Sequence, residues 1–104
     1  MNYLVTFAAA SQNSDKIINE IRKFDEWGEV TPNSFFVVSN ENAGKITERL
    51  QVYLGPKDSI AVFAVSRPWA SHCDPIVEDL ILSQIGQDKD WTPRDFNHET
   101  QGRE

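Results

Sequence analysis

The sequence predicts a single α+β domain in which two helices pack on one face of an antiparallel sheet. Four short stretches are rich in β-branched and aromatic residues, and two longer stretches carry apolar residues at helical spacing. Their order along the chain is strand, helix, strand, strand, helix, strand, and 104 residues leave room for one core only. These observations predict a ferredoxin-like βαββαβ two-layer sandwich over residues 1–86, extended by a C-terminal helix.

The predicted strands cover residues 3–8, 28–31, 34–39 and 59–66. The second and third are joined by a tight turn at 31–34, because Pro32 presets its own backbone angle and Asn33 tolerates the following turn position. A split βαβ connection places the first strand between the third and the fourth.

The predicted helices cover residues 14–25 and 41–54. Short polar side chains accept the free N–H groups of a first turn, so Ser14 is the expected N-cap of the first helix, and Asn40 or Asn42 that of the second.

The end of the domain predicts one more helix. Asp74 followed by Pro75 is typical of a helix start, so we expect a helix over residues 75–85 that Gly86 ends, with a fifth strand within 80–85 as the alternative. Residues 87–104 are polar and acidic, and they predict a flexible tail. Its expected anchors are Trp91 and Phe96.

Composition narrows the class of function. The formal net charge is −6, and the sequence contains no run of Lys and Arg that would displace counterions from phosphates. Folding could still gather basic side chains, so nucleic-acid binding stays open; these are Lys16, Arg22, Lys23, Lys45 and Arg49. The apolar stretches are too short to span a bilayer. No basic segment precedes Tyr3, so no signal peptide is expected, and the single Cys73 favours a reducing cytoplasm.

The central strands are apolar on both faces, whereas two helices cover only one. An exposed apolar sheet face usually marks an interface, so we expect a homodimer whose interface includes Val5, Phe35 and Phe63. The alternative is that residues 75–85 fold back over the sheet as a lid.

A family resemblance covers roughly residues 1–70. The segments that carry it are Tyr3-Leu4-Val5-Thr6-Phe7, Trp27-Gly28-Glu29-Val30, Ser34-Phe35-Phe36-Val37-Val38-Ser39-Asn40, Asp58-Ser59-Ile60-Ala61-Val62-Phe63-Ala64-Val65 and Ser66-Arg67-Pro68-Trp69-Ala70. This pattern resembles the small ferredoxin-like CRISPR spacer-acquisition family, with its VapD-like and SinR-like relatives. The resemblance implies a homodimer and, for some members, a metal-dependent ribonuclease.

In nuclease-like members of that family, an Asp after the first strand is thought to hold the metal. The matching position here is Ala8, and an alanine offers no oxygen ligand to a divalent cation. The sequence therefore predicts no catalytic residue, no metal site and no cofactor.

Two groups of residues are candidates for binding. Ser39 and Asn40 follow the third strand, and we expect them at the same end of the sheet as Ala8 and Ser11. Strand termination and helix capping are their alternative roles.

The second group is Ser66, Arg67 and Trp69, which we expect at the opposite end of the sheet. An Arg near a Trp is a common binding pair, and the alternative is a strand end whose Trp covers the core. His72-Cys73-Asp74 also offers three ligand types in a row, but no second pair at zinc spacing accompanies it.

The leading hypothesis is a non-catalytic homodimeric interaction protein on a CRISPR-acquisition/VapD-like fold, with an origin in a mobile element as one hypothesis. A protein partner beyond the second copy is compatible with this role. The rivals are a weak metal-dependent ribonuclease of the same superfamily and an acidic inhibitor that mimics nucleic acid, which a net charge of −6 permits.

Overall fold

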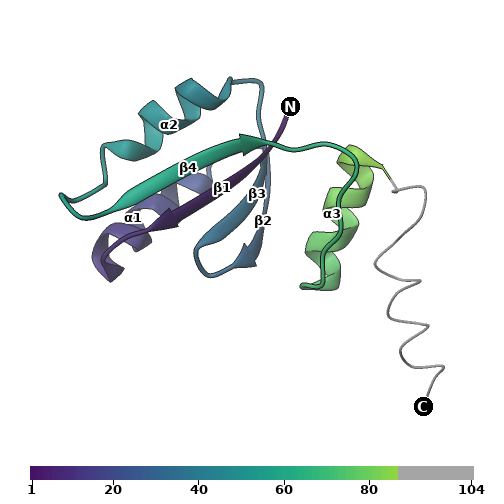
Figure 1. Ribbon diagram of the computed structural model, residues 1–104, viewed down its shortest axis with the longest axis horizontal. Helices are drawn as coiled ribbons and strands as arrows, with labels where there is room; N and C mark the ends of the chain where they lie inside the picture. Colours follow the sequence, from purple (N-terminus) through teal and green to yellow (C-terminus); the bar gives the residue numbers. More distant parts are fainter. Residues whose placement is uncertain (87–104) are drawn as a thin grey trace, which may run out of the picture.

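The computed structural model describes residues 1–86 (Figure 1). Its elements follow in the order β1 (Asn2–Ala8), α1 (Ser11–Ile21), β2 (Glu26–Thr31), β3 (Ser34–Val38), α2 (Ala43–Gln51), β4 (Ser59–Ala64) and α3 (Pro75–Ile85). The tail predicted at 87–104, with Trp91 and Phe96, lies outside the described residues.

The four strands form one antiparallel sheet in the order β2-β3-β1-β4. β1 is central, so that Val5 lies opposite Phe35 on one neighbour and Val62 on the other. This is the predicted ferredoxin-like arrangement, and the prediction is confirmed. β2 and β4 are the two edge strands.

The main core lies between the sheet and the helices α1 and α2. Alternate residues of β1 and β3 point toward this layer, as expected for strands whose side chains alternate between faces. Its buried members are Tyr3, Val5, Phe7, Ile17, Ile21, Phe24, Phe35, Val37, Ile46 and Leu50. The i, i+4 spacing of the helix members in the sequence reflects one buried stripe on each helix.

A second, smaller core lies on the opposite face of the sheet, under α3. Val77 and Ile81 of α3 pack there against Phe36, whose side chain points away from the main core. α3 lies beside β2 (Figure 1). The molecule therefore has three layers over β2 and β3 and two layers over β1 and β4. The predicted two-layer sandwich holds only for the second half.

The third helix forms as its first residues predict. The Asp74 carboxylate accepts a hydrogen bond from the N–H of Ile76 at 2.8 Å, and Gly86 ends the helix at a φ of 91°. The alternative of a fifth strand within 80–85 is wrong. Asn42, one of the two predicted caps of α2, accepts a bond from the N–H of Lys45 at 2.9 Å.

The start of α1 differs from the prediction. The helix begins at Ser11 rather than near Ser14, and its N-cap residue Ala10 has no capping side chain. Asp58, which precedes β4, accepts the Ala10 N–H at 3.2 Å and so satisfies a free donor at this helix end. None of the described helices is long and apolar enough to cross a membrane.

Candidate functional site

The two predicted binding groups lie at the same end of the sheet, not at opposite ends. The Ser39 N–H donates to the carbonyl of Met1, and the Val65 N–H donates to the carbonyl of Asn2. Both β3 and β4 run antiparallel to β1, so both end where β1 begins. The expectation that Ser39 and Asn40 accompany Ala8 is therefore wrong.

Ser39 is used by the fold itself. Its side chain is buried, its carbonyl accepts a bond from the Met1 amino group at 2.7 Å, and its hydroxyl accepts the Glu41 N–H at 3.0 Å. These contacts fit the capping role that the sequence left open. Asn40 is exposed beside it.

A polar cavity of about 180 Å³ lies at this end, between α2 and the segment before β2. Two cations are among the lining residues that the structure describes. Lys23 pairs with Glu20 at 3.1 Å, and Arg49 bonds Glu20 and Glu41 at 2.8 Å each and lies 4.2 Å from the centroid of the Phe24 ring. The hydrogen bond to Glu20 raises the pKa of Arg49, and bonds from Arg49 and Lys23 lower the pKa of Glu20. Two carboxylates therefore already neutralise the guanidinium that an anion would need.

The Arg67 and Trp69 pair is divided between surface and core. Ser66 and Arg67 are exposed, whereas Trp69 packs against the core under α3 and donates its Nε1–H to the carbonyl of Gly86 at 2.8 Å. Trp69 thus attaches the segment after β4 to the end of α3. This is the role of a Trp that covers the core, as the alternative for this group proposed.

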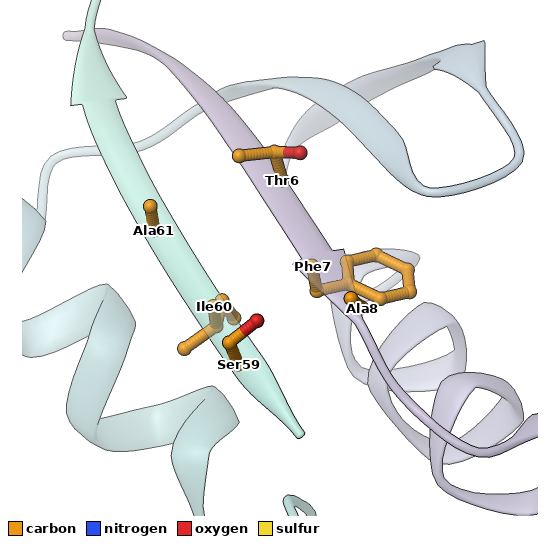
Figure 2. A pocket seen from close by; sticks show the side chains of 6 residues that line it. All are labelled: Thr6, Phe7, Ala8, Ser59, Ile60 and Ala61. Carbon is orange, nitrogen blue, oxygen red and sulfur yellow. The ribbon is translucent and has the colours of Figure 1, made fainter. Parts of the chain in front are cut away.

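The end of β1 carries a shallow pocket of about 230 Å³ between β1 and β4 (Figure 2). Ala8, where the resemblance to the nuclease family led us to look for an Asp, is one of its lining residues and lies opposite Ser59. The described residues that line this pocket include no charged side chain.

Asp58 lies directly before the strand that lines this pocket. Its oxygens accept bonds from the Gly55 N–H at 2.7 Å, the Asn13 amide at 2.9 Å and the Ala10 N–H. The bond from Gly55 is the first cause that lowers the pKa of Asp58, followed by the bond from Asn13. The carboxylate is therefore held charged by groups that fasten the α2–β4 loop to α1.

The His72-Cys73-Asp74 run has structural surroundings. Glu78 is 4% exposed and accepts bonds from the Ser71 hydroxyl and the Cys73 N–H at 2.9 and 3.2 Å. Burial raises the pKa of the Cys73 thiol, so the reactive thiolate is disfavoured. No cluster of three or more His, Cys, Asp or Glu side chains suited to a metal occurs within residues 1–86.

The expected interface residues fall on two different faces. Val5 and Phe35 are 0% and 1% exposed beneath α1 and α2, so they cannot take part in an interface of the folded chain. Phe63 points the other way and is 55% exposed. It belongs to a surface that α3 leaves uncovered, which we call the open half-face: Leu4, Thr6, Ala8, Ala61 and Phe63.

The open half-face is almost entirely apolar. The Thr6 hydroxyl accepts a bond from the Ser34 hydroxyl at 3.0 Å, and the exposed Ser59 lies opposite Ala8 at the border of this surface. β4, which contributes Ala61 and Phe63 to this surface, alone among the four strands of the described sheet contains no fully buried residue, although its sequence SIAVFA has only Ser59 as a polar side chain. An apolar edge strand that the fold buries only in part is the strongest functional signal in the described chain.

Sequence reasoning missed two groups that the fold brings together. The Arg49 cluster joins α1 to α2, and no spacing within one element could reveal it. The contact at Gly28 could have been expected from the sequence, since a glycine inside a strand suggests that another part of the chain approaches the backbone closely. A Cβ built there would lie 3.0 Å from Val77, which shows how tightly α3 is seated.

Comparison of the chain with protein-family models, with curated proteins and with solved structures finds no match. The resemblance of residues 1–70 to the CRISPR spacer-acquisition family therefore stays a prediction.

Proposed function

We propose that this chain is a non-catalytic interaction protein that works as a homodimer, and that two copies meet at the side of the sheet formed by β4. The observation that carries the proposal is the exposure of Phe63, which at 55% is the most exposed aromatic residue of the four described strands and lies on an edge strand with no fully buried residue. The resemblance to a family of homodimers agrees with it, and the lone Cys73 favours a cytoplasmic location.

The exposed area at Phe63 is large enough to matter. A phenylalanine side chain offers about 200 Å² in total, so the 55% exposure leaves roughly 110 Å² in water. Burying this area is worth about 3 kcal/mol per protomer at roughly 25 cal/mol per Å², before the cost of association. A closed two-fold dimer would bury part of this area on both protomers, so the figure is an upper bound.

Support for a non-catalytic role comes from how the polar groups are used. Arg49 is held by Glu20 and Glu41, and Asp58 by three donors that fasten a loop. Each of these charged groups therefore has a structural task. A protein that presents uncharged strand surface instead is suited to binding another polypeptide.

Sedimentation velocity at micromolar concentration tests the proposal. We expect about twice the chain mass of 11.8 kDa. Phe63→Asp should shift the distribution toward monomer, because a carboxylate cannot be buried unpaired in an apolar contact. Ile76→Asp is the matched control, since Ile76 is 78% exposed on α3, away from β4, and should leave the dimer intact. A monomer at every concentration would contradict the proposal.

The two rivals predict other results. A metal-dependent ribonuclease cleaves labelled RNA with Mn²⁺ and stops when the metal is chelated. An acidic inhibitor forms a salt-sensitive complex with a basic nuclease. We expect neither cleavage nor such a complex from the purified chain.

A further inference from the structure

The outer edge of β4 carries unpaired backbone groups. The Val65 N–H bonds β1 at 3.0 Å, and β1 residues of odd number bond β3, as the Phe7 N–H does to Asn33 at 2.9 Å. Bonding alternates along an antiparallel strand. Residues 61 and 63 therefore face β1, whereas the N–H and C=O groups of Ile60, Val62 and Ala64 point away from the sheet. Within residues 1–86 these groups bond no other element.

The other edge of the same sheet is protected against such pairing. β2 carries the charged Glu26 and Glu29, has an irregular register between Glu29 and Thr31, and is followed by Pro32. Charges, bulges and prolines are the devices by which proteins block edge-to-edge pairing. β4 has none of these features within the strand. The β2 edge is therefore protected against pairing with another strand, whereas the β4 edge is open to it.

We propose that β4 pairs antiparallel with β4 of a second copy around a two-fold axis at Val62, which joins two four-stranded sheets into one sheet of eight strands. The inference rests on the proposed homodimer and names its contact. In this register Val62 faces the partner's Val62, and Ile60 faces the partner's Ala64. The outward N–H and C=O groups of Ile60, Val62 and Ala64 on each copy are then all hydrogen-bonded, and no residue outside β4 is needed.

The side chains of β4 favour a second copy over an unrelated strand. Directly opposed side chains in an antiparallel pair lie about 5 Å apart and must share the space between them. When two copies of β4 pair antiparallel about Val62, side chains of complementary size lie opposite each other. Ile60 meets the partner's Ala64, and Phe63 meets the partner's Ala61. A large residue therefore meets a small one on both faces of the sheet. The strand also carries no charge, so the net charge of −6 is not concentrated at the contact.

Amide exchange followed by NMR tests the contact directly. We expect slow exchange for residues 61 and 63 in any folded state, because they bond β1. Ile60, Val62 and Ala64 should be slow at high protein concentration and at least tenfold faster after dilution to monomer. A dimer made of labelled and unlabelled chains should also show a contact between the Hα atoms of Ala61 and the partner's Phe63, which only this register brings together.

Variants at the axis separate backbone pairing from side-chain packing. Val62→Pro removes an N–H that the single chain does not use, so it should keep the circular dichroism of the wild type and sediment as a monomer. Val62→Ala keeps the N–H and should remain a dimer. If Val62→Pro fails to fold, the exchange pattern and the Hα contact of the wild type still decide. A dimer with fast exchange at 60, 62 and 64 that Phe63→Asp still dissociates overturns this inference and leaves the proposed function standing. A dimer with fast exchange that Phe63→Asp leaves intact, or a monomer throughout, overturns both.

Discussion

Replacing Gly28 with alanine tests whether α3 is seated on the sheet as described. The new Cβ would lie 3.0 and 3.1 Å from the two methyl groups of Val77. Overpacking of this kind costs about 1–3 kcal/mol. The same change removes the excess chain entropy of a glycine in a strand, which is worth about 0.5–1 kcal/mol in the opposite direction. We therefore expect Gly28→Ala to lower the free energy of unfolding by roughly 0.5–2 kcal/mol.

The sign of this change decides the question. Without a docked α3 nothing opposes the new methyl group, and the variant would be more stable than the wild type. Urea unfolding at one fixed protein concentration measures the difference, since a dimer makes stability depend on concentration. Val77→Ala supplies the second arm of a double-mutant cycle, and the pair should be less destabilised than the sum of the single changes, with a coupling of about 1–2 kcal/mol. Additive effects, or a stabilising Gly28→Ala, would refute the packing of α3 on β2.

Two further predictions concern the charged groups of the main layer. The folded pKa of Glu20 is below its usual 4.5, so its pairing with Arg49 stabilises the protein fully above that pH and is lost as the pH falls further. Arg49→Met should cost about 1–2 kcal/mol at pH 7 and flatten the acid limb of the stability profile. Asp58 also has a pKa below its usual 3.8, and Asp58→Ala should speed amide exchange at Ala10 and Gly55, whereas unchanged exchange there would refute its role as a fastener.

The elements whose signals are local were predictable from the sequence. The cap at Asn42 and the start at Asp74-Pro75 depend on bonds within one turn, and both occur as expected. The start of α1 was not predictable, because the carboxylate that supports it comes from Asp58, far along the chain. The sequence around Ser14 resembles a cap but lies inside the helix.

The sequence also did not predict which face of each strand packs against the helices. Phe35 and Phe36 are adjacent and both buried, one under α1 and α2 and the other under α3. The alternation of side chains shows which residues share a face of the sheet, but not which of the two faces packs against α1 and α2. For the same reason Val5 and Phe35 were expected beside Phe63, although the pairing register places them on the opposite side.

The sequence left two covers for the second face of the sheet, a second copy or the third helix, and the dimensions of the elements show why the third helix alone covers only part of it. Strands lie about 4.8 Å apart, so four strands present a width of roughly 19 Å. A helix with its side chains is about 10 Å wide and covers two strands. α1 and α2 together suffice for one face, whereas α3 alone, seated on β2 and β3, covers half of the other. The uncovered half must then fall on β1 and β4, and it is there that Phe63 and an uncharged edge remain exposed.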